Sequence, residues 1–233
     1  MRLTADFHTH TLYSHGSGSV DDNVQAAIRQ GLQAVGIADH SVDHALYGIK
    51  RRSLSDYLSH IADAKKKYED RIDVRAGIEL DLTGLDGSVD MPNGKFDTVI
   101  LGYHKAAVCR DIRTVWTFAT GRYRGHAAGI TQGYIRAIQR RHIDIIAHPG
   151  YGVPVDYKLL GQACADYGTL FEINNKHGEL TPEDIWMAAS SGARFVISSD
   201  AHTPADVGQA PHALELVKRT GLLLSQMANV TED

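Results

Sequence analysis

The chain has 233 residues, 43% of them hydrophobic, and a formal net charge of −4. This length suits one sizeable core, so we expect a single domain over residues 1–233. The longest apolar runs are far too short for a membrane span, a first strand is predicted almost at once with no room for a secretory signal, and Cys109 and Cys164 lack disulfide or thiolate-metal spacing. We therefore expect a cytoplasmic protein without a membrane segment.

Seven short apolar runs predict β-strands, at residues 3–8, 34–38, 74–80, 98–101, 143–147, 170–173 and 194–198. Helical patterns lie between them. Residues 53–68 repeat apolar side chains on one face behind a capping Ser53, and Thr181-Pro182 predicts the start of a helix whose end is marked by Gly192. Gly31, Gly168 and Gly221 also follow helical patterns, as expected for glycines with positive φ at helix ends.

Alternating strands and helices predict a parallel sheet with right-handed crossovers, either a closed barrel or a doubly wound open sheet. Candidate ligands follow the first five strands and the seventh. In an open sheet, only the strands beside the topological switch point contribute to a site, whereas a closed ring brings six strand ends together. We therefore predict the barrel.

His8 and His10 begin the series of candidate ligands. Residues two apart on a strand point to the same face, so both imidazoles can be directed at one metal ion, although an isolated pair also suits simple packing. Nine such donors occur near strand ends: His8, His10, His15, His40, Glu79, His104, His148, Asp200 and His202. Nine exceed the needs of one ion, which predicts two or three ions with Glu79 as a bridging carboxylate, and imidazole with carboxylate suits zinc, manganese or iron.

Residues 105–141 carry eight Lys or Arg and one acid, a local charge of +7, so the remainder carries −11. This asymmetry favours steering of an anionic substrate over nucleic-acid binding. Candidate phosphate-binding cations are Lys176, which follows the sixth strand beside His177, and Arg122 and Arg124 in the excursion of residues 105–130. The excursion suits either a lid or a partly helical insertion that packs on the barrel, and Arg136, Arg140 and Arg141 suit a solvated helix face.

Two acids near the ligands have two interpretations. Asp6 and Asp39 either accept the second ring N–H of a ligand histidine or make structural hydrogen bonds at strand ends. Neither is included among the catalytic residues. His44, His60, His126, His142 and His212 lie off the strand-end pattern and receive no role.

The combined motifs are His8-x-His10, His15, Asp39-His40, Glu79, His104, His148-Pro149-Gly150, Glu172-Ile173-Asn174-Asn175 and Asp200-x-His202. In this order the chain resembles, over nearly its whole length, the PHP superfamily, named for its polymerase and histidinol phosphatase members, and its short stand-alone phosphatases. The resemblance implies a distorted (β/α)7 TIM-like barrel with three divalent metal ions. It assigns His8, His10, Glu79 and Asp200 to the first ion, Glu79, His104 and His148 to the second, and His15, His40 and His202 to the third.

The resemblance implies a metal-dependent phosphoric monoester hydrolase for a small phosphorylated metabolite or nucleotide, such as a histidinol-phosphate-like or nucleoside-phosphate substrate. A metal cluster lowers the pKa of a bridging water, which predicts in-line hydrolysis by hydroxide without a Ser or Cys nucleophile. We take Glu79, Asp200 and His202 as the catalytic residues.

Three other functions remain open. A phosphodiesterase or 3′–5′ exonuclease would use the same kind of site, although the sequence has no extended basic track and nucleic acid is not expected as a partner. An amidohydrolase-like barrel has a site of one or two metals, which would not need His15, His40 and His202 as ligands. A catalytically silent, metal-stabilised scaffold would need no turnover, although the presence of every expected ligand favours an enzyme. The oligomeric state stays open.

Overall fold

Seven parallel strands form the centre of the computed structural model, which describes residues 1–232, with the backbone alone for residues 122–124. The strands are β2 (Ala5–Thr9), β3 (Ala34–Ile37), β4 (Asp73–Asp81), β5 (Thr98–Gly102), β6 (Ile145–Ile146), β7 (Leu170–Asn174) and β8 (Arg194–Ser198). Their order in the sheet is their order in the chain, and every neighbouring pair is parallel. All seven predicted strands are confirmed.

The sheet curls into a nearly closed barrel. A parallel bridge joins Thr9, the last residue of β2, to Ala201, beyond the end of β8, and the His10 amide donates to the Ala201 carbonyl at 2.8 Å. Asn229 adds a second link, because its side-chain amide donates to the carbonyls of Ala5 in β2 and Ile197 in β8. The predicted α/β barrel is therefore confirmed.

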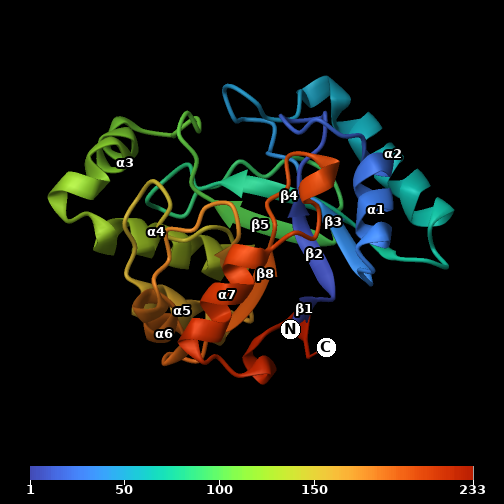
Figure 1. Cartoon of the computed structure of the whole chain (residues 1–233). Coiled ribbons are helices and arrows are strands. Elements are labelled where there is room, and N and C mark those ends of the chain that lie inside the picture. Colours follow the sequence, from blue (N-terminus) through green and yellow to red (C-terminus); the bar gives the residue numbers. More distant parts are fainter. Residues whose placement is uncertain (233) are drawn as a thin grey trace.

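Helices surround the strands, as Figure 1 shows. They are α1 (Val20–Arg29), α2 (Leu54–Lys67), α3 (Ile112–Arg124), α4 (Ala127–Arg140), α5 (Tyr157–Tyr167), α6 (Pro182–Ala189) and α7 (Pro211–Thr220), with 3-10 turns at Arg51–Ser53, Pro204–Asp206 and Leu224–Gln226. A buried apolar cluster that runs from Leu3 to Met227 fills the space between these layers.

The helix ends agree with those predicted from the sequence, with one exception. The predicted start of α6 is confirmed, since the Thr181 hydroxyl accepts from the Asp184 amide and the Asp184 carboxylate accepts from the Thr181 amide. The predicted capping by Ser53 is wrong. A 3-10 turn runs into α2, so Ser53 already has a helix-like backbone and its side chain caps nothing.

The two ends of the chain lie side by side (Figure 1). β1 (Arg2–Leu3) pairs antiparallel with β9 (Val230–Thr231), so the run predicted as one strand over residues 3–8 is divided at Thr4. Two-residue strands are too short for hydrophobic periodicity to reveal them.

The excursion at residues 105–130 is largely helical. It contains α3 and the start of α4, and the Phe118 ring packs on Tyr103 with 4.8 Å between centroids. This arrangement favours the helical insertion. Farther along α4, the Arg136 guanidinium donates to the Leu85 carbonyl at 2.6 Å, which suits the surface position expected for it.

Within residues 1–232, the structure contains no helix that combines the length and the apolar character needed to cross a membrane.

Candidate metal centre

Seven of the nine predicted ligands are buried together at the carboxyl ends of the strands. His8 lies in β2 and Glu79 in β4, whereas His10, His40, His104, His148 and Asp200 lie one to three residues beyond the ends of their strands. His202 is half-buried and His15 is exposed. The structure thus brings together residues from six strands, as a barrel requires.

Glu79 is central to the cluster. Its Oε1 lies 3.2 Å from His8 Nε2, 3.2 Å from His104 Nε2 and 3.1 Å from His148 Nε2. Its Oε2 lies 2.9 Å from His40 Nδ1, on the other side of the carboxylate. Burial alone would raise the pKa of Glu79, but His104, His8 and His40 outweigh it and hold that pKa well below its usual value. Glu79 therefore has the position and charge of a bridging carboxylate.

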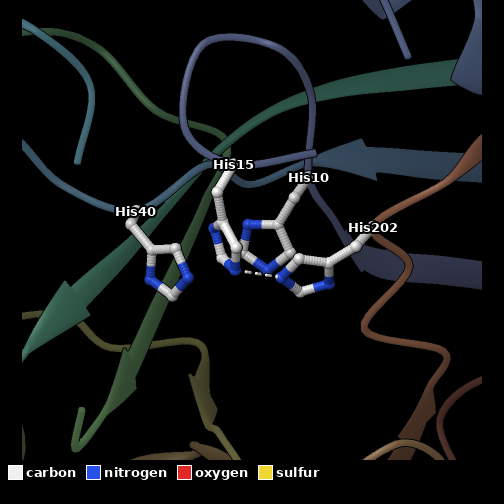
Figure 2. A group of neighbouring side chains, drawn as sticks. All are labelled: His10, His15, His40 and His202. Carbon is white, nitrogen blue, oxygen red and sulfur yellow. Dashed lines mark hydrogen bonds between the residues drawn. The ribbon is translucent and has the colours of Figure 1, made fainter. Parts of the chain in front are cut away.

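A second group consists of four histidines from three parts of the chain. His10, His15, His40 and His202 each offer a ring nitrogen, and these nitrogens all lie within 4.8 Å of one another. In Figure 2 the rings of His10, His15 and His202 face one another, with His40 directed toward them. His15 Nε2 and His202 Nε2 are only 2.6 Å apart.

Several buried polar atoms in the cluster lie close to other ligand atoms but make no hydrogen bond of good geometry within the part of the chain that the structure describes. They include His8 Nε2, both ring nitrogens of His10 and Glu79 Oε2. Such atoms are rare in folded proteins unless something else satisfies them. Unpartnered imidazole nitrogens and carboxylate oxygens that converge on one place are the donor set that zinc, manganese and iron prefer, so these residues fit divalent ions.

The geometry allows two of the histidines to serve more than one group. His10 joins the four-histidine group and also a group with His8 and Glu79, and its Nε2 lies 3.2 Å from Asp200 Oδ1. His40 joins the four-histidine group and also a group with Glu79 and His104. The division of ligands that the family resemblance implies is thus compatible with the structure but not unique to it.

Asp6 and Asp39 make structural hydrogen bonds rather than contacts with histidine rings. Asp6 accepts from the backbone amides of Ser199 and Gly208, next to the segment that carries Asp200. Asp39 accepts from the Thr11 amide at 2.8 Å and from the Thr11 hydroxyl at 2.6 Å, which holds the segment that leads to His15. Of the two interpretations from the sequence, the structural one is therefore observed.

Besides the proposed ligands Glu79 and Asp200, the acids Glu172 and Asp81 contact ligand histidines. Glu172 Oε1 lies 2.8 Å from His8 Nδ1, and Asp81 Oδ1 lies 2.8 Å from His104 Nδ1. Each contact leaves the Nε2 atom of its histidine directed at Glu79. Sequence reasoning missed both roles, although Asp81 lies two residues after Glu79 on β4 and its position offered a signal.

Two proposed ligands have unusual backbone conformations. His148 has a φ of 28° and Asp200 a φ of 54°, in the left-handed region that favours glycine. Strained non-glycine residues of this kind concentrate at functional sites, where the surrounding structure holds them in place.

A cavity of about 160 Å³ opens over the cluster, with Tyr47, Tyr151, Lys176 and His177 in its wall. Lys176 Nζ lies 2.7 Å from His202 Nδ1, and His177 Nε2 lies 3.5 Å from Asp200 Oδ2. Tyr47 and Tyr151 are additions that the sequence did not reveal, because neither follows a strand directly. The side chains of Arg122 and Arg124, predicted to bind phosphate, lie outside the described part of the structure.

Comparisons with known proteins agree with this geometry. A probable phosphatase of Thermoanaerobacter sp. (strain X514) is 28% identical, over 95% of this chain and 88% of the relative. A probable phosphatase of Aeromonas hydrophila is 26% identical, over 95% of this chain and 87% of the relative.

Solved structures show the same fold. The chain is similar to histidinol phosphate phosphatase from Lactococcus lactis, solved with zinc, L-histidinol and phosphate, with a TM-score of 0.65 and 14% identity over 95% of both chains. A putative histidinol phosphatase from Listeria monocytogenes gives a TM-score of 0.61 with 15% identity, over 88% of this chain and 97% of that one. The family model for the PHP domain matches residues 6–181. The chain therefore belongs to the PHP domain family.

Proposed function

We propose that the protein is a metal-dependent phosphoric monoester hydrolase, formed by a single cytoplasmic domain over residues 1–233. The observation that carries the proposal is the buried cluster around Glu79, with its unpartnered nitrogen and oxygen atoms. Relatives named probable phosphatases support the activity. The similar fold of a phosphatase solved with zinc, L-histidinol and phosphate supports both the activity and the metal.

The nine ligands would hold three divalent ions, either zinc, manganese or iron. We assign His8, His10, Glu79 and Asp200 to the first ion, Glu79, His104 and His148 to the second, and His15, His40 and His202 to the third. Such ions, when bound, supply a hydroxide at neutral pH and neutralise the phosphoryl oxygens.

The chain's own residues orient the reacting groups. The two carboxylate oxygens of Glu79 point toward two different groups of histidines, so Glu79 holds these groups in a fixed position relative to each other. Glu172 and Asp81 fix the tautomers of His8 and His104, which keeps each Nε2 lone pair directed at the centre. Asp200 and His202 complete the site from the end of β8.

Lys176 would bind phosphoryl oxygens at the mouth of the cavity, where its ammonium lies beside His202. The cavity of about 160 Å³ suits a phosphate group. These features favour a small phosphorylated metabolite or nucleotide as the substrate, including histidinol-phosphate-like and nucleoside-phosphate compounds.

Metal-stripped protein, reconstituted separately with zinc, manganese or iron, tests the proposal. We expect 4-nitrophenyl phosphate to be hydrolysed faster than bis(4-nitrophenyl) phosphate, and elemental analysis to find three ions per chain. Faster cleavage of the diester would favour a phosphodiesterase. No cleavage of either ester with three ions bound would favour the silent scaffold.

Two histidine variants separate the cluster from general effects. His10→Ala should abolish hydrolysis and reduce the metal content, while the circular dichroism spectrum stays that of the wild type. His212→Ala removes an exposed histidine of α7 outside the cluster and serves as the matched control.

A further inference from the structure

A second cavity borders the metal centre. Its volume is about 550 Å³, and it lies between the loop that follows β5, helix α3 and the segment around Gly152. His104 lines this groove and also the smaller cavity over the cluster, so one ligand side chain separates the two spaces. A molecule with its phosphate over the cluster would therefore have its organic part at the entrance of the groove.

Much of the groove wall is apolar. Tyr103 and Phe118 pack together, and Val115 and Ala119 on α3 line the same space. Position 152 requires glycine, because its φ is +73° and a Cβ there would lie 2.9 Å from the Tyr103 ring. Tyr103 and Phe118 are themselves almost fully buried, so the surface that the groove presents comes mainly from small apolar side chains, which suit an apolar group.

The side chains that line the groove carry little charge. Lys105 is the lining side chain with a permanent charge, and no carboxylate belongs to the described wall. The carboxylates that act on Cys109 are Asp81 and Asp111. Asp81 contacts His104, and Asp111 caps α3 by accepting from the Thr114 amide at 2.9 Å. Both acids accept hydrogen bonds outside the groove wall, and their negative charges still act on Cys109.

We propose that this groove binds the leaving group of the substrate, and that the preferred substrates are phosphate monoesters of alcohols that carry an apolar ring. This inference rests on the proposed phosphatase function. The small apolar side chains of the wall would contact such a ring, whereas a propyl group would leave most of the groove unfilled.

Kinetics with alkyl phosphates of similar reactivity test the preference. We expect kcat/KM for 3-phenylpropyl phosphate to exceed that for propyl phosphate by on the order of 10- to 100-fold, the effect of burying one aromatic ring. The kcat/KM for glycerol 3-phosphate, which has no apolar ring, should also fall below that for 3-phenylpropyl phosphate. Equal kcat/KM values for the propyl and phenylpropyl esters would overturn the inference and leave the phosphatase assignment intact.

Alkylation of Cys109 gives a readout that needs no turnover. Cys109 is half-buried in the groove wall, whereas Cys164 is fully buried and burial raises its pKa to about 12, so mass spectrometry of the alkylated protein reports on Cys109. We expect 3-phenylpropylphosphonate to protect Cys109 in the metal-loaded protein and propylphosphonate to protect it far less. Equal protection by the two phosphonates would count against the groove.

Two tryptophan variants on α3 complete the test. Val115→Trp should fill the groove. The ratio of kcat/KM for 3-phenylpropyl phosphate to that for propyl phosphate would then fall toward one, and the phosphonate would no longer protect Cys109. Ile112→Trp lies on the same helix, is 82% exposed outside the groove wall, and should keep the wild-type selectivity. If none of the esters is hydrolysed, the phosphatase function fails, and protection of Cys109 alone then decides whether the groove binds rings.

Discussion

Glu172 offers a sharp test of how the fold prepares the metal centre. Its carboxylate accepts three hydrogen bonds within the protein: from His8 Nδ1 at 2.8 Å, from the His148 amide at 2.6 Å and from the Asn174 side chain at 2.9 Å. The first bond uses Oε1 and the other two use Oε2. Both oxygens therefore act as acceptors, and the side chain is completely buried.

Glu172→Gln keeps the shape of the side chain but replaces one acceptor with an NH₂ donor. If the NH₂ faces His8, the Nδ1–H of that ring loses its acceptor. If it faces the other way, His148 and Asn174 lose theirs. Each buried donor left unsatisfied costs about 1–3 kcal/mol, so we expect the free energy of unfolding to fall by at least that amount. The orientation with the NH₂ facing His8 leaves fewer donors unsatisfied and is therefore favoured. Because His8 is then no longer held in its tautomer, metal affinity should fall about 10- to 100-fold.

Chemical denaturation of the metal-free protein measures the first effect, and competition with a chelator measures the second. Glu215→Gln is the matched control, since it makes the same substitution at an exposed position on α7. A Glu172→Gln protein with wild-type stability and wild-type metal affinity would refute the claim that Glu172 orients His8.

Three further predictions concern the cluster, the phosphate and a buried acid. Glu79→Ala should abolish hydrolysis and lower the metal content. Circular dichroism should still show a folded protein, because the ligand residues lie at the end of the barrel and not in its apolar core. Lys176→Met should raise KM for 4-nitrophenyl phosphate about 10-fold with a smaller change in kcat, as expected when a substrate-binding cation is lost. Asp90→Asn should stabilise the protein increasingly as the pH rises from about 4 to about 8, by on the order of 2–5 kcal/mol at the upper limit.

The sign for Asp90 follows from its surroundings. Burial, and next the charge of Asp81, raise the pKa of Asp90 to about 8. Between the unfolded pKa and the folded one, the native state holds a proton that the unfolded state has lost, so wild-type stability falls as the pH rises through this window. Asn keeps the acceptor that receives the Asp81 amide at 2.7 Å and does not titrate. Parallel pH dependences of unfolding for the two proteins would contradict the raised pKa.

Lys176→Arg is the control for Lys176→Met. Lys176→Arg keeps the positive charge and should recover most of the KM, whereas failure of both replacements to change KM would exclude a contact with phosphate. Wild-type turnover and full metal content in Glu79→Ala would show that Glu79 does not bridge ions.

Local patterns in the sequence predicted most of the elements. Strand-length apolar runs and helix-end glycines depend on residues close together in the chain, so the seven strands could be found without tertiary information. The predicted ends of the elements were less accurate than the elements themselves. The first apolar run is two strands, and Ser53 does not cap its helix because a 3-10 turn precedes it. The candidate ligands could also be recognised in the sequence, because metal binding requires particular residue types and these residues lie at the ends of predicted strands.

The sequence by itself determined which residue types stand at the strand ends, and hence that a parallel barrel would gather histidines and carboxylates at one mouth. Only the tertiary structure decided which atoms meet. His8 finds its acceptor in Glu172, 164 residues away, and the groove beside His104 exists because α3 lies against the loop after β5. Such contacts depend on side-chain direction and on packing between distant segments, which periodicity along one chain does not encode.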